Sequence, residues 1–156
     1  MNPSVNIRQL KEGDFAGVKN IDVLTQKDYL GLAWEKMSKT DQENTLITKK
    51  SEFKQNCQTG FSFVAEMDNK IVGFIFGQET LPFPDKIYVR HIAIHPDYQA
   101  KGIGKKLYEA LINKAKKTGK KEIIATINPD NPPSIKLHEQ LGFKVKDWKL
   151  ATYAIK

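Results

Sequence analysis

The stretch that decides the fold centres on six residues, Gln99-Ala100-Lys101-Gly102-Ile103-Gly104. Before them lies Ile87–Ile94, whose β-branched and aromatic residues favour a strand. After them, apolar residues recur every fourth position up to Ala115, a spacing that predicts an amphipathic helix. The sequence therefore predicts a strand, a glycine-rich turn and a helix, in that order.

A turn of this kind favours the binding of an anion. The first backbone N–H groups of a helix have no partner within the helix, and the helix dipole adds partial positive charge at the same point. Gly102 and Gly104 let a ligand approach the backbone closely, because neither has a Cβ. Lys101, Lys105 and Lys106 add charge nearby. The sequence thus predicts a site for a ligand that carries phosphate.

Two common phosphate motifs do not fit this turn. The dinucleotide pattern G-x-G-x-x-G requires a third glycine where Leu107 stands, and the nucleoside-triphosphate loop requires Ser or Thr where Lys106 stands. The pattern that fits is Q-x-x-G-x-G. It resembles the coenzyme A pyrophosphate loop of the GCN5-related N-acetyltransferase (GNAT) family.

Three further segments resemble motifs of the same family, in the family's order. Ile92–Pro96 resembles the central strand that ends in a proline just before the loop. Asn128–Ser134 resembles the N-x-x-A/S element, with Asn131 and Ser134 in its key places. Leu137–Phe143 resembles the L-Y-x-x-x-G-F signature. On these motifs the chain is identified as a member of the GNAT family.

The resemblance implies an α/β (α+β) fold of one domain over residues 1–156, with a mixed central sheet flanked by helices. Local patterns agree with the family's order of elements. Phe61–Glu66 and Ile71–Gln78 are expected to form a hairpin, and Phe143–Ile155 the last one or two strands. The other expected elements are a strand at Val5–Leu10, a helix from Asp14 toward Leu24, short helices within Thr25–Lys50, a helix from Glu43 to Gln58, a strand at Glu122–Ile127 and a helix from Asn131 to Gly142.

The family resemblance also implies the co-substrate, acetyl-CoA, and no metal. The main chain of the central strand would hold the pantetheine arm and polarise the thioester, and the loop would hold the pyrophosphate. The implied binding residues are Ile92, Ala93, Ile94, Gln99, Ala100, Lys101, Gly102, Ile103, Gly104, Lys105, Asn131 and Ser134.

The expected general acid differs from the family pattern. His138 stands where family members commonly carry a tyrosine that protonates the departing thiolate. A protonated imidazole can donate to a thiolate, because a free thiol has the higher pKa. A packing role is the equal alternative, since Ile135, His138 and Leu141 share one helix face. Solvent can also protonate the thiolate.

No single general base is favoured. Tyr88 and Arg90 occupy the strand positions where the family often carries a base, and neither is a base near neutral pH. His91 is a candidate if a β-bulge re-aims it, and Glu66 and Glu79 are candidates at the ends of the hairpin strands. An acceptor amine of low pKa needs no dedicated base.

Composition limits the remaining classes. The net charge of +7 is spread along the chain, without the interleaved lysines and aromatics of single-strand nucleic-acid binders, so nucleic acid is not an expected partner. No apolar run approaches the ~20 residues of a membrane span. A single cysteine, Cys57, and the lack of a leader pattern favour the cytoplasm.

The expected function is acetyl transfer from acetyl-CoA to a primary amine, directly within a ternary complex. The acceptor is either a protein amine (N-terminus or lysine) or a small amino compound. A non-catalytic acyl-CoA-binding or regulatory module is the alternative, and nucleic-acid binding is a third that rests on charge alone. The resemblance also leaves a homodimer open, because family members often pair through sheet edges.

Overall fold

The computed structural model describes residues 4–155. One compact unit falls within Met1–Thr126 and a second within Ile127–Lys156, and each is described by itself. The elements of the first unit are β1 (Asn6–Gln9), the 3₁₀ helix η1 (Glu12–Asp14), α1 (Phe15–Leu30), α2 (Leu32–Lys36), α3 (Lys39–Thr45), α4 (Lys50–Gln58), β2 (Phe63–Met67), β3 (Lys70–Glu79), β4 (Lys86–Ile94), the 3₁₀ helix η2 (Pro96–Tyr98), α5 (Ile103–Lys117) and β5 (Glu122–Ala125).

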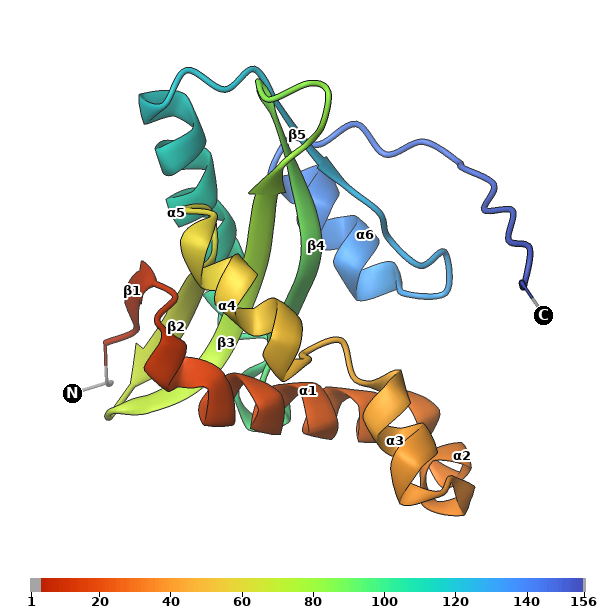
Figure 1. Ribbon diagram of the computed structural model, residues 1–156. Coiled ribbons are helices and arrows are strands. Elements are labelled where there is room, and N and C mark those ends of the chain that lie inside the picture. The colour runs from red at the N-terminus through yellow and green to blue at the C-terminus, as the bar shows by residue number, and fades with distance from the viewer. Residues whose placement is uncertain (1–3, 156) are drawn as a thin grey trace. The chain divides into compact units, whose positions relative to one another are not determined.

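The strands form one mixed sheet in the order β1-β2-β3-β4-β5 (Figure 1). Neighbouring strands are antiparallel except β4 and β5, which are parallel. The predicted hairpin is confirmed: Asp68 and Asn69 form the turn between β2 and β3 with φ of 48° and 59°. Aspartate and asparagine tolerate this left-handed conformation better than most residues. The sheet and its helices confirm the predicted fold class.

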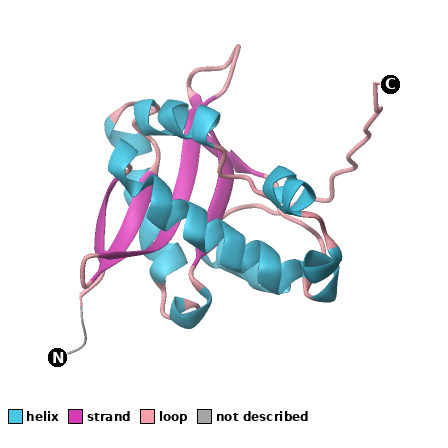
Figure 2. Cartoon of the chain, turned by 60° about the horizontal axis from the view of Figure 1, so that its bottom comes forward, coloured by secondary structure: helices cyan, strands magenta, loops and turns pink. Residues whose placement is uncertain are grey.

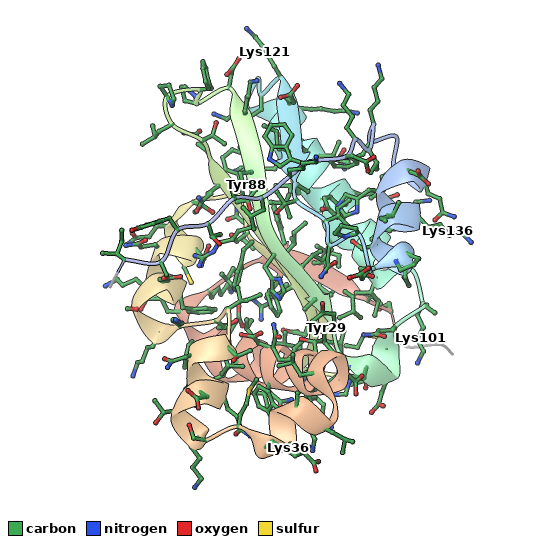
Figure 3. All side chains as sticks on the ribbon, turned by 90° about the vertical axis from the view of Figure 1, so that its right-hand side faces the viewer. Tyr29, Lys36, Tyr88, Lys101, Lys121 and Lys136 are labelled. Carbon is green, nitrogen blue, oxygen red and sulfur yellow. The ribbon has the colours of Figure 1, made fainter. Side chains whose placement is uncertain are left out.

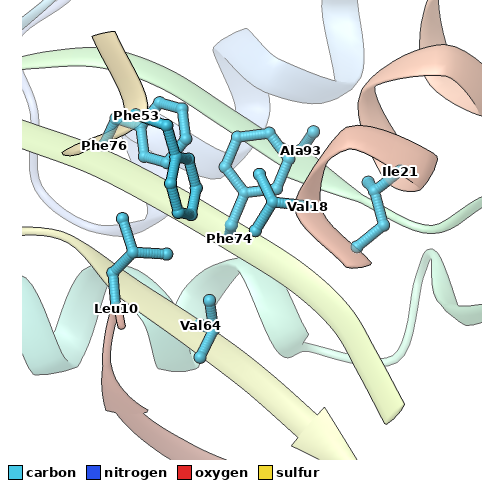
Figure 4. Packing of buried hydrophobic residues seen from close by; sticks show 8 residues of the cluster. All are labelled: Leu10, Val18, Ile21, Phe53, Val64, Phe74, Phe76 and Ala93. Carbon is cyan, nitrogen blue, oxygen red and sulfur yellow. The ribbon is translucent and has the colours of Figure 1, made fainter. Parts of the chain in front are cut away.

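Helices cover both faces of the sheet. Figure 2 shows helices lying across one face of the sheet. On the face of α1 and α4, Phe74 and Phe76 of β3 pack with Val18 of α1 and Phe53 of α4 (Figure 4). On the other face lies α5, whose buried residues follow the predicted spacing. Gly77 of β3 leaves room there, because a Cβ on it would lie 2.6 Å from a backbone carbonyl oxygen and 3.2 Å from a leucine of α5.

The helical segments before the hairpin differ from the sequence prediction. α1 continues to Leu30 instead of ending near Leu24, and the helix expected from Glu43 to Gln58 is divided. The division has a tertiary cause: the backbone N–H of Thr48 donates to Oδ2 of the buried Asp22 at 2.6 Å. A buried carboxylate needs such donors, so this contact outweighs the local helical pattern.

The helices of the described chain are too short for a bilayer. The longest, α1, has 16 residues, whereas a span needs about 20 apolar ones. None of the helices in residues 4–155 is long and apolar enough to cross a membrane.

The second unit contains one helix, α6 (Pro132–Gln140), within its described residues. The prediction of a last strand or two within Phe143–Ile155 is wrong, because this segment runs without a strand. Trp148 and Ile155 are 88% and 86% exposed. The physical reason is that β-forming residues make a strand only when a neighbouring strand accepts their backbone hydrogen bonds. The prediction of one domain over residues 1–156 stays a prediction.

Candidate active site

The central feature of the site is the outer edge of β4. Its first half, Lys86–Val89, pairs with β5. Its second half, as far as Ile94, pairs with β3 on one side only, within the part of the chain that the structure describes. The two parallel strands therefore separate after Val89 and leave a stretch of strand edge open.

Two residues of this open stretch direct their backbone groups outward. The N–H of His95 donates to the carbonyl of Val72 on β3 at 2.9 Å. In an antiparallel ladder the residues that bond to the neighbour alternate, so Ala93 faces β3 as His95 does, while Ile92 and Ile94 face away. The backbone of Ile92 and the N–H of Ile94 are thus available to an extended ligand, whereas the carbonyl of Ile94 accepts from the side chain of Gln99. Ala93 bonds toward β3 and packs its side chain in the core.

A β-bulge marks the point where the strands separate. Phe76 of β3 lies opposite His91, whereas Gly77 lies opposite Val89, so Arg90 is the extra residue. Because of this bulge, His91 faces α1 and α4, whereas strict alternation from Val89 would place it on the opposite face. His91 therefore stays a candidate base. Bulges re-aim side chains in this way and are common beside active sites.

The loop that follows has the conformation of an anion cradle. Gln99 fixes its start, because its side-chain amide donates to the carbonyl of Ile94 at 3.2 Å. Ala100 and Gly102 have φ of 59° and 75°, and no atom lies within 4 Å of the place where a Cβ of Gly102 would be. The first backbone bond of α5 runs from Lys106 to Gly102. The preceding N–H groups, those of Ile103, Gly104 and Lys105, point out of the helix start.

The lysines around the loop lie at the surface, and their ammonium groups contact other parts of the protein. The ammonium of Lys101 donates to the carbonyl of Asp97 at 3.0 Å and lies 5.0 Å from the ring centre of Tyr98 (Figure 3). Lys105 pairs loosely with Glu109 at 3.8 Å. Both side chains are long and exposed, so they can turn toward a bound phosphate. The residues present therefore fit a pyrophosphate.

The side chain of His91 is mostly buried and lies near the buried carboxylate of Asp22. Its ring lies 5.5 Å from that of Phe74, and its Nε2 is buried with no hydrogen-bond partner among the described residues. Burial lowers the pKa of His91, although the nearby carboxylate of Asp22 opposes this. Oδ1 of Asp22 is likewise buried and unpartnered within residues 4–155. A neutral His91 with a free ring nitrogen is the state that this environment favours.

Two polar side chains, one in the bulge and one just before it, make contacts with neighbouring elements. The guanidinium of Arg90 pairs with the carboxylate of Glu52 on α4 at 2.7 Å. The hydroxyl groups of Tyr88 and Thr126 lie 3.2 Å apart, which joins β4 to the end of β5 (Figure 3). Arg90 thus reaches the same face as His91. Sequence reasoning missed Glu52, because nothing in the local pattern links α4 to a bulge in β4.

The carboxylates predicted at the hairpin ends are engaged elsewhere. Glu79 is tied to the ammonium of Lys120, which also donates to a backbone carbonyl of the β3–β4 loop. Glu66 accepts from Arg8 at 2.8 Å, and Arg8 also grips Asp14 through two bonds of 2.8 Å. Burial would raise the pKa of Asp14, but the bonds from Arg8 and a backbone N–H outweigh it and lower that pKa.

The Arg8 network borders an open pocket of about 560 Å³. The pocket lies between β1, the start of α1, the hairpin turn and η2. Neither Arg90 nor the loop before α5 lines it. This pocket is therefore distinct from the open edge of β4.

The predicted residues of the second unit have clear local roles. Asn131 caps α6, because its side-chain oxygen accepts from the backbone N–H of Ser134 at 3.3 Å. His138 is 2% exposed. Its Nδ1 lies 2.7 Å from the carbonyl of Ser134, and because a carbonyl can only accept, this nitrogen carries a proton. Its ring meets that of Phe143 edge-on.

An open strand edge beside the N–H groups of a helix start is an arrangement that suits an extended, phosphate-bearing ligand. Comparison with known proteins identifies the family. The model of the acetyltransferase (GNAT) family matches residues 27–143. The chain therefore belongs to the acetyltransferase (GNAT) family.

Individual relatives agree with this assignment. An L-2,4-diaminobutyric acid acetyltransferase of Nocardia farcinica is 36% identical over 76 residues, 49% of this chain and 39% of that protein. An L-methionine sulfoximine/L-methionine sulfone acetyltransferase of Salmonella typhimurium is 37% identical over 84 residues, 53% of this chain and 49% of that protein. The aligned part thus spans half or less of these curated relatives.

The fold itself is shared with solved structures. The PaiA N-acetyltransferase of Thermoplasma acidophilum, solved in complex with coenzyme A, superposes with a TM-score of 0.80. The superposition covers 94% of this chain and 93% of that one, at 21% sequence identity. At this identity the likeness concerns the fold.

Proposed function

We propose that this protein is an acetyl-CoA-dependent N-acetyltransferase that moves an acetyl group directly to a primary amine in a ternary complex. The observation that carries the proposal is the open edge of β4, which lies next in the chain to the N–H groups of the loop and of the α5 start. Membership in the GNAT family supports it. The two relatives act on small amino compounds by their names, which supports an acceptor of that class here.

Each part of the site has a proposed task. The N–H groups of Ile103, Gly104 and Lys105 hold the pyrophosphate, with charge added by Lys101. The outward backbone groups of β4 pair with the pantetheine arm as another strand would, and Ile92 orients the thioester carbonyl. Acetyl-CoA supplies the thioester, and the chain supplies position and a polarising N–H group.

The amine must lose a proton to react. Between the two catalytic base candidates, the contacts favour His91 over Glu79, because Glu79 is neutralised by Lys120 while His91 keeps an unpartnered ring nitrogen beside the bulge. The buried nitrogen would act through a water molecule. For His138 the two roles, proton donor to the departing thiolate and packing residue, both stay open. Its burial and its bond to the carbonyl of Ser134 support the packing role.

A non-catalytic acyl-CoA-binding module is the second candidate. It is favoured by Tyr88 and Arg90, which occupy the β4 positions where a base is common in the family and cannot serve as one near neutral pH. Such a module would bind acetyl-CoA and release no thiol.

Calorimetry tests the acetyl-CoA binding on which both candidates depend, and release of free thiol in the presence of an amine then distinguishes the enzyme from the module. The purified protein is titrated with acetyl-CoA and, separately, with ATP, NAD and a short oligonucleotide. Selective micromolar binding of acetyl-CoA, about −8 kcal/mol, is the expected result. Binding of the oligonucleotide alone would contradict the proposal and make the basic surface the functional one.

A further inference from the structure

Arg90 is the residue that the bulge sets apart. It has no partner residue on β3, and its side chain projects to the face of α4, which the next residue, His91, also faces because of the bulge. It lies two residues before Ile92, so their Cα atoms are about 7 Å apart along the strand. The residue that carries this cation is thus a near neighbour of the residue proposed to orient the thioester.

The partner of Arg90 indicates what this cation can bind. Glu52 presents one carboxylate oxygen to its guanidinium at 2.7 Å. The two side chains are 38% and 39% exposed, so solvent reaches part of each, although the Glu52 oxygen that faces Arg90 is itself buried. The contact uses Nη1 of Arg90. An arginine binds a carboxylate through paired N–H donors, so the remaining donors of Arg90 can take up a carboxylate of a ligand.

We infer that Arg90 binds a carboxylate of the acceptor, so that the acceptor is an amino acid with a free carboxylate. This inference rests on the proposed function and names its acceptor class. The amine of such a molecule lies within a few bonds of its carboxylate, which suits the short distance between Arg90 and Ile92. Peptide N-termini lack the carboxylate.

The test pairs each common L-amino acid with its own carboxamide. The wild-type protein is mixed with acetyl-CoA and each compound, and the released thiol is followed with a chromogenic thiol reagent. At least one amino acid is expected to exceed its carboxamide tenfold or more in kcat/KM. The carboxamide has the less basic amine, so intrinsic reactivity favours it and cannot produce this preference.

Two variants connect the preference to Arg90. Arg90→Gln is expected to lower kcat/KM for the amino acid at least tenfold, mainly through KM, and to abolish the preference over the carboxamide. Lys86→Gln is the matched control: Lys86 is a cation at the other end of β4, paired with Glu122 at 3.1 Å and similarly exposed. It is expected to keep the preference.

The outcomes separate the inference from the function on which it rests. Equal use of amino acids and carboxamides would overturn the carboxylate site and leave the acetyltransferase intact. An equal loss on both compounds in Arg90→Gln would assign that residue a structural role and overturn the inference as well. Binding of acetyl-CoA without transfer to any compound of the panel would overturn the amino acid acceptor, and transfer to a peptide or polyamine amine would then show whether the proposed function survives.

Discussion

Replacement of Gly104 by valine separates cofactor binding from folding. Gly104 lies in the first turn of α5. In a helix valine is slightly more favourable than glycine, so the free energy of unfolding is expected to change by less than about 0.5 kcal/mol. The branched side chain would stand where the pyrophosphate meets the N–H groups of Ile103, Gly104 and Lys105. Loss of one charge-assisted hydrogen bond costs about 1.5–3 kcal/mol, which weakens acetyl-CoA binding roughly 10- to 150-fold.

The measurement combines calorimetric titration with thermal unfolding. Gly119→Ala at the other end of α5 provides the control. Its φ of 71° makes alanine unfavourable there by about 1 kcal/mol, so this variant should lose stability and keep its affinity. Gly104→Val is thus expected to lower affinity and keep stability, whereas Gly119→Ala is expected to lower stability and keep affinity. Wild-type affinity in a folded Gly104→Val protein would refute the assignment of the loop.

Three further substitutions test the structure around the site. Asp14→Asn should lower the free energy of unfolding by about 2 kcal/mol at pH 7. The bonds from Arg8 hold the pKa of Asp14 in the folded protein below the ordinary value near 4, so this stability is present above that pH and lost below it. Urea unfolding measured from pH 7 to pH 3 should therefore show a steeper loss of stability for the wild type than for the variant. His138→Ala should lower stability by about 2–4 kcal/mol through a cavity and a lost bond, and unchanged turnover per folded molecule at high pH would exclude the donor role. Gly77→Ala should cost about 2 kcal/mol, because its Cβ would lie 2.6 Å from a carbonyl oxygen, whereas thermal unfolding of Gly13→Ala, with open space around it, should show no comparable loss.

Local patterns were sufficient for the parts of the site that are local in the chain. The glycines of the loop, the spacing of α5 and the cap at Asn131 all depend on residues within a few positions of one another. The sequence therefore predicted the strand, loop and helix that form the cofactor side. The hairpin of β2 and β3 was predicted for the same reason, since its two strands are separated by only a few residues.

The acceptor side depends on contacts that no local pattern contains. Whether Arg90 and His91 share a face is decided by the register between β3 and β4, and strict alternation places them on opposite faces. Glu52 and Asp22 reach this place from separate helices. The same limit explains the strands predicted after Gly142, since alternation of apolar residues cannot supply a pairing partner.

The most direct test of the account is catalytic turnover. The protein is incubated with excess acetyl-CoA and a mixture of L-amino acids, and N-acetylated products are identified and counted by mass spectrometry. The account predicts many molecules of one or a few N-acetyl amino acids for each protein molecule, with an equal amount of free coenzyme A. Tight binding of acetyl-CoA without any acetylated product would contradict the account, in which the acceptor is an amino acid.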